Sequence, residues 1–147
     1  MTPADDAILR LLPHRPPMLM VDGLEDAAPG TFRARLTLRP DNPFIDGDGN
    51  LERAAYPELI AQCFAAGAGS SVGGEDGGER PLGFLAGFRD IVVLADAGVG
   101  DVLVTEVTVA TTLGNVSVVD GIVTGPQGVL ATGQIKVYLE DGAARTA

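Results

Sequence analysis

The chain has 147 residues, of which 46% are hydrophobic, and it carries a formal net charge of −10. This length and composition predict one globular domain over residues 1–147 and exclude a disordered chain. Ten basic residues against twenty acidic ones argue against nucleic-acid binding, which needs a basic surface to displace counterions from phosphates.

The N-terminal segment predicts a short helix and no targeting signal. Residues 5–12 are apolar enough for a helix, which Pro13 ends. The acidic residues near the start are unlike the basic beginning of a signal peptide, and no apolar run in the chain reaches the roughly 20 residues of a membrane span. The single cysteine, Cys63, excludes an internal disulfide and fits a reducing compartment. We therefore expect a cytoplasmic protein.

Two strand-like runs follow, at residues 18–27 and 31–39. The sequence Ala-Pro-Gly between them is typical of a turn, so the two runs predict a hairpin. Nine of the ten basic residues are arginine, and Arg33, Arg35 and Arg39 lie close together in the second run. On an acidic protein these three side chains can form a local anion-binding patch.

One long helix is predicted at residues 57–72. Pro57 suits a first helical turn. Large and small apolar residues occupy nearly every side of the helix, which predicts that it is buried all round. Gly67 and Gly69 weaken it, and the glycine-rich residues 73–81 are expected to end it in a mobile loop.

Four further strands are predicted after this loop, at residues 83–94, 102–111, 116–124 and 129–139. In the last of them, Val129, Ala131, Gly133, Ile135, Val137 and Leu139 share one face and polar residues alternate with them. The Asp-Gly pair at residues 120–121 is predicted to lie within a strand, because valines flank it. Two strands, a buried helix and four more strands predict an α+β fold, with an antiparallel sheet curled around a central helix.

Several familiar kinds of site are excluded. Residues 46–50, DGDGN, begin like a calcium-binding EF-hand loop, but Leu51 and Pro57 occupy the positions that need glycine and glutamate. Cys63 lies in the middle of an apolar helix, where a thiol is usually inert. One histidine and one cysteine are too few for a zinc site.

Glu58, near the start of the predicted helix, has two interpretations. A glutamate in a first helical turn complements the helix dipole and is a common surface feature. If the sheet encloses the helix, however, burial raises the pKa of such a carboxyl group and suits it to proton transfer near neutral pH. Gln62 lies one turn further on the same face, where it can hold Glu58 or a substrate carbonyl.

His14 is the only histidine and lies between prolines in the sequence LLPHRPPM. One interpretation is structural, in which the imidazole orders a turn by hydrogen bonding to the backbone. The other is catalytic, since histidine is the usual base near pH 7.

A family resemblance joins these segments. LLPHRPPMLMVD (residues 11–22) is similar to the N-terminal signature of the 3-hydroxyacyl-[acyl carrier protein] dehydratases of the hotdog fold, and PELIAQCFAA (57–66) resembles their central helix. LGFLAGFRDIVVL (82–94), GVGDVL (98–103) and GVLATGQIKVYL (128–139) resemble their later strands and a turn. The resemblance covers nearly the whole chain and is closest to the dehydratase-like subunits of aryl polyene and related polyene pathways.

The resemblance implies a hotdog fold of about six strands around one helix, in dimers with active sites at the subunit interface. It also implies removal of water from a 3-hydroxyacyl thioester, carried on the phosphopantetheine of an acyl carrier protein, without a cofactor of the enzyme's own. Glu58 corresponds to the family's helical acid, and His14 to a motif histidine that is not the usual catalytic one. We take both as candidate catalytic residues.

Five residues are candidate substrate contacts. They are Gln62, Asp48, Tyr56, Gly83 and Phe84. Backbone N–H groups near residues 55–57 or 83–84 are expected to polarise the thioester carbonyl.

The chain departs from the family at one motif. The family's catalytic histidine lies in a Gly-His-Phe-Pro loop before the helix, and Asp48 stands at about that position here. A second hotdog chain that retains the histidine can complete a site with Glu58, so both a homodimer and a heterodimer are open. Two other functions also remain open, namely a hotdog thioesterase whose carboxylate activates water and a non-catalytic subunit that supports a partner.

Overall fold

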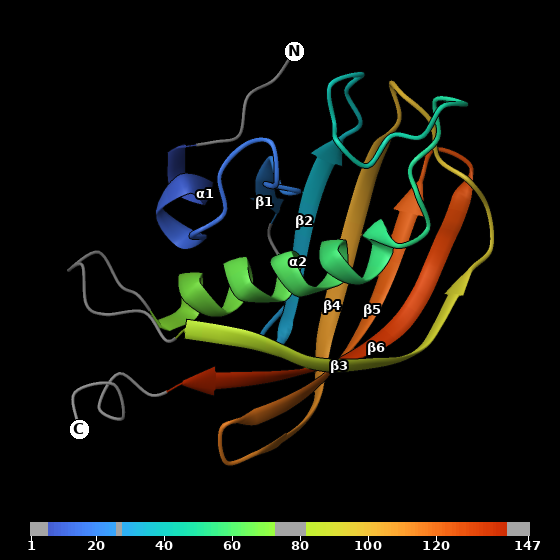
Figure 1. Ribbon diagram of the computed structural model, residues 1–147. Helices are drawn as coiled ribbons and strands as arrows, with labels where there is room; N and C mark the ends of the chain where they lie inside the picture. The colour runs from blue at the N-terminus through green and yellow to red at the C-terminus, as the bar shows by residue number, and fades with distance from the viewer. Residues whose placement is uncertain (1–5, 26–27, 73–81, 141–147) are drawn as a thin grey trace.

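The computed structural model describes residues 6–25, 28–72 and 82–140, with residues 6, 69–72, 82–84 and 140 described by their backbone alone. Within these ranges the chain forms two helices and six strands (Figure 1). They are α1 (Asp6–Leu11), β1 (Gly23–Glu25), β2 (Thr31–Thr37), α2 (Ala55–Val72), β3 (Leu82–Val93), β4 (Val102–Leu113), β5 (Val116–Gly125) and β6 (Gly128–Glu140).

The strands form one antiparallel sheet in the order β1-β2-β4-β5-β6-β3. Helix α2 lies across the face of this sheet, and α1 lies beside it (Figure 1). The core between helix and sheet is apolar and includes Leu59, Ile60, Val107 and Val119, each at most 1% exposed. This arrangement confirms the predicted α+β class and the hotdog fold.

Glycines let α2 approach the sheet closely. A Cβ atom on Gly121 of β5 would lie 2.7 Å from two side-chain carbons of Ile60, and a Cβ atom on Gly67 of α2 would lie 2.1 Å from the ring of Phe32. Both distances are shorter than real carbon contacts. Gly121 therefore has a packing role within β5, which confirms that Asp120–Gly121 is not a hairpin turn.

The prediction that α2 is buried on every side is only partly correct. Glu58, Ala61, Ala65 and Ala68 are half-buried, whereas their neighbours are buried. The spacing of these four residues places them on one helix face. This face, which we call the open stripe of α2, is the side of the helix that the rest of the described chain leaves partly uncovered.

Two predicted strands differ from the observed ones. Residues 18–27 were expected to be extended, but among residues 18–25 only Gly23–Glu25 form a strand, β1, and residues 26 and 27 lie outside the described part. The backbone at Met18 and Met20 is bound by the side chain of Gln62 in α2 instead of by a strand. In β6, Val129 was expected to share a face with Ala131, which is buried, but Val129 is exposed and Leu130 is buried. A register shift between β5 and β6 at this point reverses the alternation.

Strand β3 lies at the edge of the sheet and pairs only with β6 among the described strands. Its exposed side chains include Leu85, Phe88 and Val92. Two register shifts interrupt its pairing with β6, and Asp90, which lies within the second shift between Arg89 and Val92, has a left-handed φ of 54°. Neither helix in the described ranges is long and apolar enough to cross a lipid bilayer.

Candidate active site

Glu58 and Gln62 lie one turn apart at the start of α2 and are hydrogen-bonded to each other. The side-chain amide of Gln62 donates to Oε1 of Glu58 at 2.7 Å and to the carbonyl oxygen of Met18 at 3.0 Å. Its own carbonyl oxygen accepts from the backbone N–H of Met20 at 2.7 Å. Gln62 is 1% exposed, so the contacts of this buried amide hold the carboxylate of Glu58 and the backbone of residues 18–20 together.

His14 lies against the same carboxylate, because the loop between α1 and β1 passes over the start of α2. Its Nε2 is 3.6 Å from Oε1 of Glu58, and the two side chains are 32% and 34% exposed. Nδ1 of His14 is buried and has no hydrogen-bond partner among the described residues. The structure thus brings both candidate catalytic residues into contact within one chain.

Arg15 shapes the loop that carries His14. Its guanidinium donates to the carbonyl oxygens of Leu12 and His14, each at 2.8 Å. These bonds fix the backbone just after the short first helix and beside the imidazole. Arg15 is therefore bound to backbone carbonyls and has a structural role.

Asp48 lies in a turn before α2 that Asp46 organises. One carboxylate oxygen of Asp46 accepts from the backbone N–H groups of Asp48 and Asn50, at 2.9 and 3.0 Å. Asp48 itself is exposed. It is not in contact with Glu58 in any described interaction, so this chain alone does not bring it into the site.

Tyr56 is fully buried at the start of α2, and its hydroxyl has no hydrogen-bond partner among the described residues. Burial raises the pKa of this hydroxyl, and the negative charge of Asp96 adds to the effect. A side chain with no exposed surface cannot touch a substrate without a rearrangement of the loops over it.

The backbone donors expected near residues 55–57 are already used. The N–H of Ala55 donates to Glu52 and that of Tyr56 donates to Arg53, and Pro57 has no N–H. Gly83 and Phe84 lie on the edge strand β3, opposite Leu139 and Tyr138 of β6, while the side chain of Phe84 is outside the described part. Because antiparallel hydrogen bonds alternate, one of two consecutive amides on an edge strand points away from its partner strand.

The three arginines expected to bind anions are engaged within the chain. The guanidinium of Arg33 donates to Glu106 across β2 and β4, which raises the pKa of Arg33, and Arg39 pairs with the buried Asp22 at 3.3 Å. Arg35 also has an interaction partner. A group of three free cations is therefore not available on this surface.

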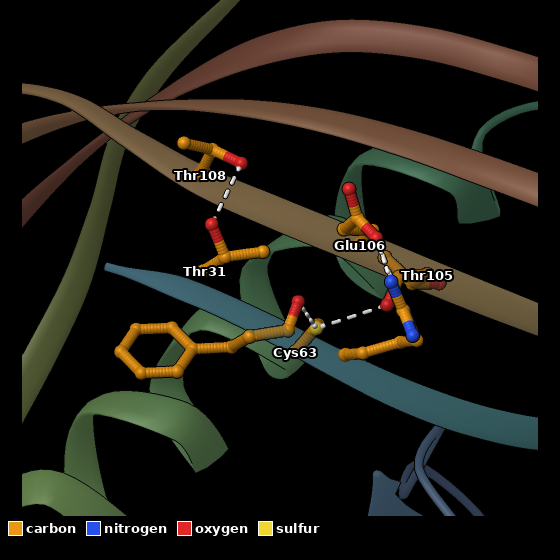
Figure 2. A network of polar contacts seen from close by, with 7 residues as sticks. Thr31, Cys63, Thr105, Glu106 and Thr108 are labelled. Atoms are coloured by element: carbon orange, nitrogen blue, oxygen red, sulfur yellow. Dashed lines mark hydrogen bonds and ion pairs between the residues drawn. The ribbon is translucent and has the colours of Figure 1, made fainter. Parts of the chain in front are cut away.

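Figure 2 shows the surroundings of Cys63, whose thiol points into the sheet. The thiol donates to the carbonyl oxygens of Phe32 and Thr105, at 3.6 and 3.4 Å. Burial raises the pKa of Cys63 to about 12. The thiol is protonated at neutral pH and faces no open surface, which agrees with its interpretation as part of the core.

A groove of about 470 Å³ borders the loop that carries His14. Its lining includes Pro16, Pro17 and Leu19 from that loop, and Leu36, Arg39 and Pro43 from β2 and the segment after it. Within residues 6–25, 28–72 and 82–140, no cluster of three His, Cys, Asp or Glu side chains has the arrangement of a metal site.

Sequence reasoning missed the role of residues 18–20. The signal available was Gln62 itself, since a glutamine among apolar helix residues needs hydrogen-bond partners when it is buried. The contact of Gln62 with Glu58 was expected from their spacing, but its contacts with the backbone of Met18 and Met20 were not.

The antiparallel sheet around the long helix α2 places the chain in the class of hotdog-fold proteins, here with a helical glutamate held beside a histidine. Within this class the chain belongs to the ApeP-like dehydratase family, whose model, described as ApeP dehydratase, matches residues 6–147. This match confirms the resemblance to hotdog dehydratases and to the subunits associated with polyene pathways. No curated protein sequence matches the chain.

Solved structures agree with the fold. The dehydratase heterocomplex ApeI:P from Xenorhabdus doucetiae is similar, with a TM-score of 0.82 and 22% identity over 95% of this chain and 94% of that chain. A hypothetical thioesterase with coenzyme A from Streptococcus pneumoniae has a TM-score of 0.63 and 16% identity, over 80% and 84% of the two chains. The PaaI protein from E. coli has a TM-score of 0.64 and 15% identity, over 82% and 80%. At these identities the structures establish the fold alone.

Proposed function

We propose that this chain takes part in dehydrating a 3-hydroxyacyl thioester carried on an acyl carrier protein, with Glu58 as a proton-transfer group. The observation that carries the proposal is the placement of Glu58. Its carboxylate is held by the buried Gln62, while a third of the side chain remains exposed. A carboxylate that is fixed on one side and accessible on the other is suited to exchanging a proton with a bound molecule.

The reaction requires two proton transfers. A base removes a proton from C2, which the thioester carbonyl acidifies, and the electron pair forms the C2–C3 double bond. The C3–O bond breaks, and an acid protonates the departing hydroxyl group to give water and a 2-enoyl thioester. These steps use proton transfer alone, so the proposal includes no redox cofactor.

The thioester carbonyl needs a hydrogen-bond donor to stabilise the negative charge that develops when C2 loses its proton. Because the N–H groups of Ala55 and Tyr56 are already bonded, we assign this role to a backbone amide of Gly83 or Phe84 on the edge of β3. Gly83 and Phe84 are consecutive residues of β3 and pair with β6. Because antiparallel hydrogen bonds alternate, the backbone N–H of one of these two residues points away from β6.

We further propose that the site is completed by a second, different hotdog chain. Support comes from the similar structure, which is itself a heterocomplex, and from the exposed apolar residues of β3, such as Phe88 at 59%. The open stripe of α2 offers small residues against which a partner or an acyl chain can pack. A partner that bears a histidine supplies the second proton-transfer group that Asp48 does not provide here. We expect the complex to act in the cytoplasm, where Cys63 stays reduced.

The test uses the assembly that the chain forms in its native host. The purified assembly is given a 3-hydroxyacyl-acyl carrier protein, and the 2-enoyl product is measured by mass spectrometry. We expect Glu58→Gln to lower turnover by about 100-fold or more. Glu52→Gln is the matched control, because Glu52 is an exposed carboxylate just before α2.

Each possible result separates the candidate functions. Full turnover by Glu58→Gln contradicts the proposal. Release of a free thiol in place of the enoyl product supports the thioesterase alternative. Native mass spectrometry of the same sample gives the subunit composition, and an active assembly of this chain alone contradicts the heteromeric part.

A further inference from the structure

We infer that a hollow on the outer face of the sheet, framed by Arg89 and Lys136, binds the phosphodiester group that joins the pantetheine arm of the substrate to its carrier. The outer face is the one opposite α2 (Figure 1). The inference rests on the proposed function, because it names the part of the carried substrate that this chain recognises away from the reacting carbons.

The two cations are diagonal neighbours on adjacent strands. Lys136 of β6 pairs with Gly87 of β3, and Arg89 follows two residues after Gly87 with no register shift between them. Ile135, next to Lys136, is buried in the core, so Lys136 and Arg89 point to the outer face. Diagonal neighbours on one face of a sheet are about 7–8 Å apart, and one phosphate group can contact two flexible side chains across this separation.

The space between the cations is open because Gly87 has no side chain. No atom lies within 4 Å of the place where a Cβ atom of Gly87 would stand. The hollow has a volume of about 280 Å³, and its lining includes Gly87, Arg89, Val118 and Lys136. A compact anion such as a phosphodiester can enter this volume, whereas a flat acidic protein surface would leave it unfilled.

Both cations are accessible on a chain whose net charge is −10. Lys136 is exposed and has no ion pair or hydrogen bond within the described part of the chain. Arg89 pairs with its neighbour Asp90 at 3.5 Å, but these side chains are 75% and 80% exposed, so solvent screens the pair. Asp120, on the neighbouring strand β5, accepts a hydrogen bond from Gln134. Arg89 and Lys136 therefore retain N–H donors for an external anion.

The hollow lies within reach of the proposed position of the thioester. Gly83 and Phe84, one of which is proposed to bind the thioester carbonyl, precede Gly87 on β3 by a distance of about 10–14 Å at the rise of an extended strand. A pantetheine arm is a flexible chain that can span such a gap. A partner paired to the edge of β3 extends the sheet and leaves the outer face open, so the hollow stays accessible in the complex.

Three substrates with the same 3-hydroxyacyl group test this assignment in the complete assembly. The group is carried on the carrier protein, on phosphopantetheine, or on pantetheine, which lacks the phosphate. We expect Lys136→Ala and Arg89→Ala each to raise KM about 3- to 10-fold for the two substrates with phosphate. KM for the pantetheine substrate and kcat for all three should not change.

Two further variants sharpen the comparison. Asp90→Asn should lower KM for the two substrates with phosphate, because it removes the carboxylate that competes for Arg89. Arg10→Ala is the matched control, since it removes an exposed cation of α1 and should leave KM unchanged for all three.

Every other pattern overturns the inference. A higher KM for the carrier substrate alone would mean that Arg89 and Lys136 contact the protein surface of the carrier. Equal losses with all three substrates would mean a structural or catalytic effect. An unchanged KM in both variants would mean that the substrate does not use the hollow.

Binding can also be measured without turnover. Lys136 is the only lysine of the chain, so labelling this subunit with ¹⁵N-lysine gives one backbone amide signal at the hollow in the complete assembly. Phosphopantetheine should shift this signal in a saturable way, and pantetheine at the same concentration should not. Equal shifts, or no shift with phosphopantetheine, contradict the inference. A saturable shift in an assembly that forms no enoyl product would contradict the proposed function alone.

Discussion

The side-chain carbonyl of Gln62 accepts a hydrogen bond from the backbone N–H of Met20 at 2.7 Å, between residues 42 positions apart. This bond joins the start of α2 to the loop that carries His14. The same amide group donates to Glu58, so one buried side chain holds both parts of the candidate site.

Replacing Gln62 should therefore destabilise the protein and weaken the site together. Gln62→Leu leaves the N–H of Met20 and the carbonyl oxygen of Met18 without their partner, and we expect a loss of roughly 1–3 kcal/mol in the free energy of unfolding. The measurement is chemical denaturation. Gln134→Leu is the control, because Gln134 bonds to Asp120 at the surface and should change stability by less than about 0.5 kcal/mol. Equal effects of the two substitutions would contradict this account of Gln62.

Gly121 should not tolerate a side chain. The Cβ atom of Gly121→Ala meets Ile60 at 2.7 Å in a fully buried contact, so we expect a loss of about 1–3 kcal/mol, measured by thermal unfolding. Ile60→Val in the same chain removes a methyl group at the contact and should recover part of the loss. Gly47→Ala is the control, since no atom lies within 4 Å of its Cβ position; a comparable loss there would point to a cause other than packing.

Removing one partner of the ion pair between Asp22 and Arg39 should destabilise the folded protein. Asp22 is 5% exposed and Arg39 20% exposed in their side chains, and Asp22 also accepts from the N–H of Thr37. We expect Asp22→Ala to cost about 2–4 kcal/mol, because it leaves a largely buried cation unpaired. Asp22→Ala combined with Arg39→Met should be less destabilised than the single variant if the unpaired charge is the cause.

An exposed ion pair provides the comparison with the pair of Asp22 and Arg39. Arg53 and Asp96 form an ion pair at 3.7 Å with exposed side chains. Asp96→Ala should change the free energy of unfolding by less than about 1 kcal/mol, because solvent screens such pairs. A large loss of stability in Asp96→Ala would show that burial does not explain the difference between the exposed pair and the pair of Asp22 and Arg39.

The buried thiol of Cys63 should make the free energy of unfolding depend on pH. The pKa of its thiol is about 12 in the folded chain against an ordinary 9.0, so an unfolded chain releases the proton first as pH rises. The stabilisation is complete below pH 9.0 and is lost between 9.0 and about 12, by up to about 1.4 kcal/mol per pH unit. Cys63→Ala should flatten the fall of melting temperature in this range, and an unchanged slope would contradict the prediction.

A second buried group provides the control for the pH measurement. Burial also raises the pKa of Tyr56 above its ordinary 10.0, so Tyr56→Phe should affect the slope only above about pH 10. The two variants are therefore distinguished by the pH at which the melting temperature of each begins to differ from that of the original chain.

Much of the fold and part of the site could be predicted from the sequence. The long helix, the four later strands and the pairing of Glu58 with Gln62 depend on residues a few positions apart, where periodicity is informative. Predictions failed where a distant contact overrides the local pattern. The strand expected from residue 18 begins only at Gly23, since Gln62 binds the backbone of Met18 and Met20 before it, and the face of β6 changes at Val129 because its register with β5 shifts.

The sequence by itself determined which groups can perform the chemistry, because it contains one histidine and places one carboxylate near the start of an apolar helix. Only the tertiary structure decided that His14 reaches Glu58, that Asp48 does not, and that Arg33 and Arg39 are paired with carboxylates. The physical reason is that helix and strand preferences arise from neighbours in the chain. The position of a loop over a helix, by contrast, arises from packing and hydrogen bonds between residues far apart in sequence.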